Sequence, residues 1–142
     1  MRILAALLLF LQCISSQSLN DLGITVTTTD RQFVVTNKEA GTFQGEVNGS
    51  NQGGWQGWFI NAEKIVHDYT ITVRNGALDR STAKTTVFPH QLIRRYPNGV
   101  TETVTLADSV DALIVDVSDP FARLSLQPTD NFQKDTTVAD PF

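Results

Sequence analysis

The sequence has few of the residues on which disulfide frameworks and metal sites depend. Its 142 residues include one cysteine, Cys13, and two histidines, His67 and His90. Cys13 falls in an N-terminal segment that we expect to be removed, so the mature chain cannot form an internal disulfide and must depend on its hydrophobic core. The two histidines are too isolated in the chain to form a metal site. We therefore predict no metal and no cofactor.

Positive charge is also scarce. Eleven Lys and Arg residues stand against 15 Asp and Glu residues, which gives a net charge of −4, and removal of Arg2 would make it about −5. No basic run is present, so nucleic acid is not an expected partner. The sequence also lacks a G-x-S-x-G motif, a phosphate-binding loop and a dinucleotide fingerprint.

Long apolar runs are absent except at the N-terminus. Met1 and Arg2 precede the apolar residues 3–11, and Ser15 and Ser16 follow. This layout is typical of a secretory signal peptide, which we assign to residues 1–17, with a secreted or periplasmic mature protein. The alternative, an N-terminal core helix or anchor, is disfavoured because the run has no amphipathic period. No later stretch approaches the ~20 apolar residues of a membrane span, so none is predicted.

No stretch has the sustained apolar period of a helix. Alternating apolar and polar residues instead predict short strands at 23–29, 32–36, 68–74, 82–87, 90–96, 100–106, 111–117 and 123–127. In the stretch 100–106 the inner face consists of Val100, Val104 and Leu106, interrupted by Glu102. We therefore predict an all-β fold, an antiparallel β-sandwich or barrel, over residues 18–142.

Turn signals separate several of these strands. Asn75-Gly76 is the pair that a type I′ hairpin turn prefers, and Pro97-Asn98-Gly99 fits a turn whose glycine adopts a left-handed conformation. The last residues, 128–142, are polar, and we expect the chain to be a piece of a longer protein. Such a piece would expose sheet faces and edges, which tend to associate.

The segment 41–61 concentrates unusual residues, because it holds six of the nine glycines and both tryptophans. Trp55 and Trp58 are the best candidates for a sugar-stacking surface, since an aromatic face can cover the C–H face of a sugar ring. In a regular strand, however, residues 55 and 58 point to opposite faces unless Gly57 makes a bulge, so we expect at least one of them in the core. Trp58 is expected beside Ile60 in the core, and Trp55 is expected to be the more exposed ring.

Carboxylates invite a glycosidase interpretation, which needs a pair of them across the scissile bond. The candidates are Asp68, Asp79, Glu102, Asp108 and Asp111. Nothing in their spacing sets one pair apart, and carboxylates at strand ends and turns are usually solvated, so no catalytic residue is assigned. Asn48-Gly49-Ser50 is a formal N-glycosylation acceptor.

Four segments, taken in order, resemble the N-terminal domain of bacterial and archaeal glycogen debranching enzymes, the amylo-α-1,6-glucosidase-like glycoside hydrolases. They are residues 36–41, 53–61, 88–100 and 103–109, and the resemblance spans roughly residues 30–118. It departs from the family at Gln56-Gly57-Trp58, where the family usually has a basic residue and a histidine before the glycine.

The resemblance implies a large β-sandwich, like a supersandwich, placed before an (α/α)6 barrel that carries the catalytic acid and base. That barrel is missing from this sequence, so no catalytic residue can be carried over. The first hypothesis is therefore the N-terminal β-sandwich of a secreted glycoside hydrolase acting on α-glucans, inactive by itself. The second is a stand-alone module that binds an α-glucan or other polysaccharide through Trp55 or Trp58. A structural surface protein is a third.

Overall fold

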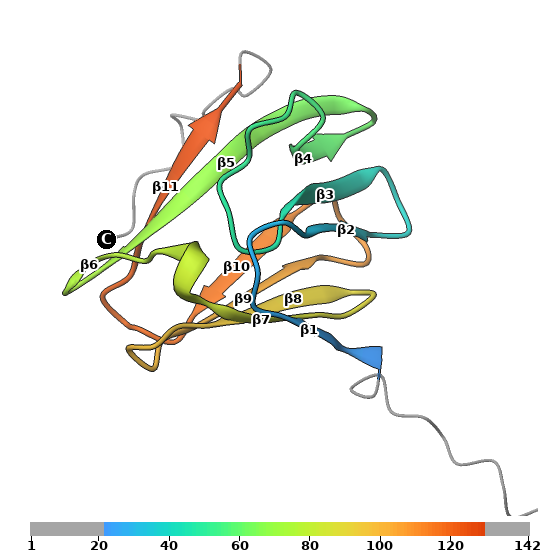
Figure 1. Ribbon diagram of the computed structural model, residues 1–142. Helices are drawn as coiled ribbons and strands as arrows, with labels where there is room; N and C mark the ends of the chain where they lie inside the picture. Colours follow the sequence, from blue (N-terminus) through green and yellow to red (C-terminus); the bar gives the residue numbers. More distant parts are fainter. Residues whose placement is uncertain (1–21, 130–142) are drawn as a thin grey trace, which may run out of the picture.

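The computed structural model describes residues 22–129, which form two antiparallel sheets packed face to face (Figure 1). The five-stranded sheet has the order β1 (Ile24–Val26), β7 (Lys84–Val87), β8 (Gln91–Arg95), β9 (Thr101–Leu106) and β10 (Leu113–Val117). The six-stranded sheet has the order β11 (Arg123–Pro128), β5 (Glu63–Val73), β4 (Gly57–Ile60), β3 (Gly41–Glu46) and β2 (Gln32–Thr36), and β6 (Gly76–Ala77) pairs with β5.

The predicted all-β sandwich is thus confirmed for the described residues. One short 3-10 helix, η2 (Arg80–Thr82), joins β6 to β7, and no helix among residues 22–129 is long and apolar enough to cross a membrane. The predicted signal peptide, residues 1–17, and the C-terminal residues 130–142 lie outside the described part of the chain.

The core lies between the two sheets and follows the strand alternation. On β5, Tyr69 and Ile71 face inward and are buried, as the alternation predicted. Phe33 on β2 and Phe43 on β3 pack edge to face with their ring centroids 5.1 Å apart. Aromatic pairs in this arrangement stabilise a core beyond the area that they bury. Leu92, Val104 and Leu106 of the five-stranded sheet belong to the same cluster, so both sheets contribute to one core.

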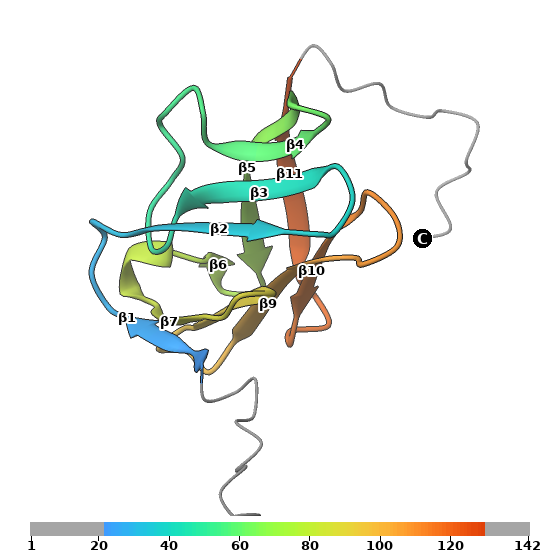
Figure 2. The same cartoon turned by 90° about the vertical axis from the view of Figure 1, so that its right-hand side faces the viewer.

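The loop between β3 and β4 departs from expectation. The sequence predicts no strand between residues 36 and 68, but Gly41–Glu46 forms strand β3, paired on both sides with β2 and β4. Only residues 47–56 form a loop, which runs over the upper left of the molecule in Figure 2 between β3 and β4. The expected strand at 68–74 is also longer, because β5 begins at Glu63.

Two expected turns have different outcomes. Gly99 has a φ of +86°, so the turn at residues 97–99 is as predicted. The hairpin after β5 pairs Val73 with Gly76, so its turn residues are Arg74 and Asn75, one position earlier than expected, and neither has a positive φ. The type I′ interpretation is therefore wrong at this hairpin.

Candidate functional site

The loop of residues 47–56 is held by buried side-chain amides. Asn48, Asn51 and Gln56 are 0%, 5% and 2% exposed. The Asn48 amide donates to the carbonyl oxygen of Thr28 at 3.0 Å and accepts from the Thr85 hydroxyl, which ties the loop to the five-stranded sheet. Because buried polar groups are costly unless paired, these bonds fix one loop conformation.

Asn51 and Gln56 bind the rest of the loop to the six-stranded sheet. The Asn51 backbone N–H donates to the Asp68 carboxylate at 3.0 Å, and its side chain donates to the His67 carbonyl oxygen at 2.8 Å. The Gln56 side-chain oxygen accepts from the backbone N–H groups of Gln52 and Gly53 at 2.6 and 2.7 Å, and its side-chain nitrogen donates to the Glu46 carboxylate on β3 at 2.5 Å. Both ends of the loop are therefore anchored to strands.

Trp55 is the exposed aromatic residue of this anchored loop, with 46% of its surface accessible. One edge of its indole lies against Gly53, where an added Cβ would come within 2.8 Å of the indole Nε1. The Gln44 side chain on β3 donates to the Trp55 carbonyl oxygen. A large aromatic side chain is thus displayed by a loop whose three buried side-chain amides are hydrogen-bonded.

Trp58, the second predicted sugar contact, lies on β4 opposite Phe43 and Val66. Its side chain is partly buried and packs against the core cluster. Its indole Nε1 is inaccessible and has no hydrogen-bond partner among residues 22–129. The expectation that Trp58 packs in the core and Trp55 is the more exposed ring agrees with this placement.

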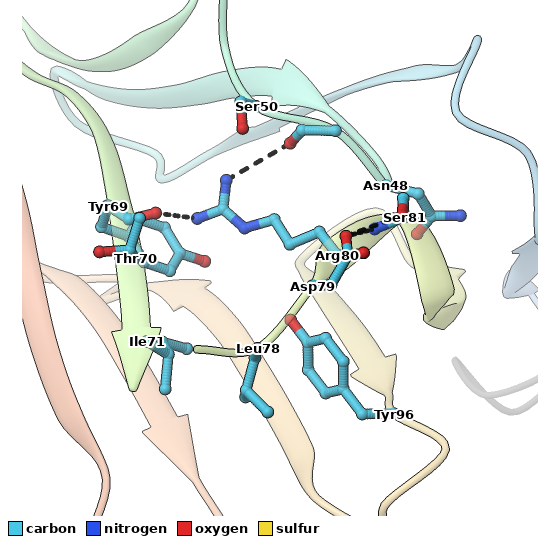
Figure 3. Close-up of a pocket in the computed structure, with 11 residues that line it drawn as sticks. Asn48, Ser50, Tyr69, Thr70, Ile71, Leu78, Asp79, Arg80, Ser81 and Tyr96 are labelled. Atoms are coloured by element: carbon cyan, nitrogen blue, oxygen red, sulfur yellow. Dashed lines mark hydrogen bonds between the residues drawn. The ribbon is translucent and has the colours of Figure 1, made fainter. Parts of the chain in front are cut away.

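The other end of the loop lines a pocket of about 200 Å³. Its walls come from Gly49 and Ser50 of the loop, Thr70 and Ile71 of β5, the residues around η2, and Tyr96 after β8 (Figure 3). The Arg80 side chain extends across the pocket from η2 to β5 (Figure 3). Its guanidinium is 2.7 Å from the Asp68 carboxylate and lies 4.3 Å from the centroid of the Tyr69 ring.

Arg80 joins three separate parts of the chain. Besides Asp68, it donates to the carbonyl oxygens of Tyr69 and Gly49, the latter at 3.4 Å. The two charges are 11% and 4% exposed, so this is a nearly buried ion pair. The hydrogen bonds that Arg80 makes thus link η2 to β5 and to the loop along the β5 side of the pocket.

A second ion pair is buried between the sheets. Arg94 on β8 and Glu102 on β9 lie opposite each other, with 2.8 Å between the guanidinium and the carboxylate. The hydroxyls of Tyr69 and Tyr96 both donate to Glu102. Arg94 also donates to the Val47 carbonyl oxygen at 2.7 Å, so this network reaches the first residue of the loop.

The protonation of this network follows from burial and charge. Burial opposes ionisation of Glu102, but Arg94 and the two tyrosine hydroxyls outweigh it and hold the pKa of the carboxyl below its ordinary value. Burial and the neighbouring Glu102 charge raise the pKa of Tyr69 and of Tyr96. The stable state of the network at neutral pH is therefore an ionised Arg94–Glu102 pair with two neutral phenols.

The predicted carboxylate candidates do not share one environment. The expectation that they are solvated is wrong for Asp68 and Glu102, which are 3% and 0% exposed because each has an arginine partner. It holds for three exposed residues: Asp79, which caps η2 by accepting from the Ser81 N–H, Asp108, and Asp111. Within residues 22–129 no group of three or more possible metal ligands comes together.

The two histidines also have separate surroundings. His67 Nε2 lies 3.1 Å from the Asn51 carbonyl oxygen, which adds to the anchoring of the loop. His90 is exposed beyond the end of β7. Nothing in the described part of the chain brings the two rings together on a metal.

Sequence patterns alone did not predict the ion pairs of Arg80 and Arg94 or the anchoring role of the three loop amides. A signal existed for Glu102, whose inward position in an otherwise apolar face demands a buried partner of opposite charge. No comparable signal marks Asn48 or Asn51, which bind groups far away in the sequence, or Gln56, which binds backbone N–H groups of its own loop.

Comparisons with protein-family models, with curated proteins and with solved structures found no match to this chain.

Proposed function

We propose that this β-sandwich binds a polysaccharide, an α-glucan in the first instance, with Trp55 as the side chain that stacks on a sugar ring. The observation that supports the proposal is the display of Trp55, 46% exposed, on a loop anchored by three buried amides. A ring held in place before binding loses little conformational freedom when a ligand arrives. Trp58 has no part in the proposed contact, because it packs against the core.

The proposal gives the described residues no catalytic step. The two buried carboxylates, Asp68 and Glu102, are each bonded to an arginine. A glycosidase would need one of a pair of carboxyl groups to give up a proton to the leaving sugar. The resemblance to debranching enzymes places that chemistry in a separate (α/α)6 barrel and makes α-glucan the ligand to test.

Affinity electrophoresis in gels containing glycogen or maltodextrin tests the proposal. We expect the wild-type chain to be retarded, and Trp55→Ala to lower the affinity by about tenfold, or roughly 1–2 kcal/mol. Phe121→Ala is the matched control, because Phe121 is an aromatic residue 59% exposed elsewhere on the surface. No release of glucose is expected from either polymer.

Two glycine variants test whether glucan binding depends on the position in which the Trp55 ring is held. At Gly53 an added methyl would contact the Trp55 indole, whereas at Gly54 it would meet nothing within 4 Å. Gly53→Ala should therefore weaken glucan binding and Gly54→Ala should not. Wild-type protein that runs unretarded in every glucan gel, or equal retardation of Trp55→Ala and wild type, would refute the proposal.

A further inference from the structure

Strand β11 forms one edge of the six-stranded sheet and leaves part of its inner face uncovered. Leu124 and Leu126 pair with Ile71 and Tyr69 of β5. Opposite residues of an antiparallel pair point to the same face, so both leucines face the space between the sheets. Ile71 and Tyr69 are 3% and 1% exposed, but Leu124 and Leu126 are 46% and 42% exposed.

The facing sheet is open along the same side. A cavity of about 220 Å³ is lined by Ile71, Val115, Val117 and Leu124, among others. Val115 lies on β10 opposite the fully buried Val104, so it also belongs to an inner face. The interface between the sheets therefore continues out to β10 and β11, and no other segment of residues 22–129 covers it there.

The exposure of inward-facing residues is particular to the β11 edge, because the inward residues of the other edge strand, β2, are buried. On β2 the inward residues Phe33 and Val35 are 4% and 1% exposed. Edge strands in natural proteins are usually protected by an inward-pointing charge, a bulge or a proline within the strand. On β11 the inward positions are leucines, and both its register shift, between Gln127 and Pro128, and its proline come only at the end of the strand, beyond Leu124 and Leu126.

We propose that β11 pairs with β11 of a second copy of this chain, antiparallel about a two-fold axis through Ser125. In this register Leu124 of one copy lies opposite Leu126 of the other, so the four leucines meet on one face. Arg123 lies opposite Gln127, and no like charges oppose each other along the strand. A two-fold axis at Arg123 would instead set that cation against its own copy, which disfavours that register.

The pairing is self-complementary, as a two-fold interface requires. It joins the two six-stranded sheets through the backbone groups of β11 that point away from β5, and it extends the existing interface between the sheets across both copies. Trp55 takes no part in it, so the proposal does not depend on glucan binding.

Disulfide trapping tests the register. At the axis, Ser125 lies opposite Ser125 of the second copy, with their Cα atoms about 4.5–5.5 Å apart as in any antiparallel pair. A disulfide spans Cα separations of about 4.4–6.8 Å. In the full chain carrying Cys13→Ser, we expect Ser125→Cys to form a covalent dimer on mild oxidation. Thr72→Cys, exposed one strand further in on β5, is the control and should stay monomeric.

Light scattering after size exclusion tests the interface without a cross-link. The average mass of the wild-type chain should rise from monomer to dimer with concentration, and Leu126→Lys should remain monomeric. Val34→Lys, on the outer face of the opposite edge strand, should still dimerise. Wild-type protein that is monomeric at every concentration would overturn the proposal and would mean that another segment covers β11. Cross-linking of Thr72→Cys equal to that of Ser125→Cys would also overturn it.

Discussion

Arg94 and Glu102 lie opposite each other on β8 and β9, 2.8 Å apart, and neither side chain is accessible to water. The pair stands between the two sheets and contacts both, because Tyr69 of the six-stranded sheet donates to Glu102. Through Val47 and Glu46, whose carbonyl oxygens accept from Arg94, it also holds the start of the loop of residues 47–56. The charge pair thus connects the core to the candidate binding loop.

Removal of one partner should be strongly destabilising. Arg94→Met leaves the Glu102 carboxylate buried without its counter-charge, which costs about 3–5 kcal/mol of the free energy of unfolding. Urea denaturation measures this loss. Arg95→Met on the same strand is the control, because Arg95 is exposed and should change stability by less than about 0.5 kcal/mol. A loss at residue 94 no larger than at residue 95 would contradict a buried ion pair.

The pair also predicts how stability depends on pH. Since the folded chain holds the pKa of Glu102 below its ordinary value of 4.5, this carboxyl contributes stability that is fully present above that value. The contribution is lost as the pH falls through the lower pKa of the folded state. The free energy of unfolding should therefore decrease in acid below pH 4.5. In Glu102→Gln this part of the acid dependence should disappear, whereas Asp79→Asn at an exposed cap should retain it.

The placement of Trp58 leads to a prediction that distinguishes it from Trp55. Trp58 packs against the core from β4, so Trp58→Ala should cost about 3–5 kcal/mol and lower the melting temperature substantially. Trp55→Ala should leave the melting temperature nearly unchanged, because 46% of the surface of Trp55 is accessible. Circular dichroism melts of both variants decide between these roles, and a reversed order would assign Trp58 to the surface.

Alternation predicted the strands well where each residue faces either core or solvent. The inward set Tyr69, Ile71 and Val73 on β5 and the inward position of Glu102 on β9 followed from a period of two. The pattern could not predict β3, because its inward residues include Gly41 and Gly45, and glycine is more typical of a loop than of a strand. Gly45 is required by packing, since an added Cβ would lie 2.2 Å from the Asn51 side-chain oxygen.

The turn between β4 and β5 was not predicted, because an alanine occupies one of its two left-handed positions. Asn61 and Ala62 connect β4 to β5 with φ values of 51° and 67°, the left-handed pair of a type I′ turn. Alanine is rarely found there, so propensity pointed instead to Asn75-Gly76. The loop of residues 47–56 was unpredictable for another reason: its shape depends on partners in β5 and β7, whose proximity is a property of the whole fold.

The burial of Asn48 predicts the fate of the glycosylation acceptor Asn48-Gly49-Ser50. A glycan would attach to the Asn48 side-chain nitrogen, which is 0% exposed and donates to the carbonyl oxygens of Val26 and Thr28 at 3.4 and 3.0 Å. Attachment would break these bonds and leave buried groups unpaired, at about 1–3 kcal/mol for each. Folding and glycosylation at this residue therefore exclude each other.

Expression in a eukaryotic secretory host should yield folded protein without a glycan on Asn48, and any glycosylated chains should be retained as misfolded material. Ser50→Ala destroys the acceptor but keeps the Asn48 bonds, because Ser50 is exposed. It should raise the secreted yield and leave the melting temperature unchanged. Asn48→Gln also removes the acceptor but should unfold the domain or lower its melting temperature, since the longer side chain does not fit the bonds to Thr28 and Thr85. Mass spectrometry of the secreted protein measures whether Asn48 carries a glycan. A cooperatively folded chain with a glycan on Asn48 would contradict the prediction that folding excludes glycosylation at this residue.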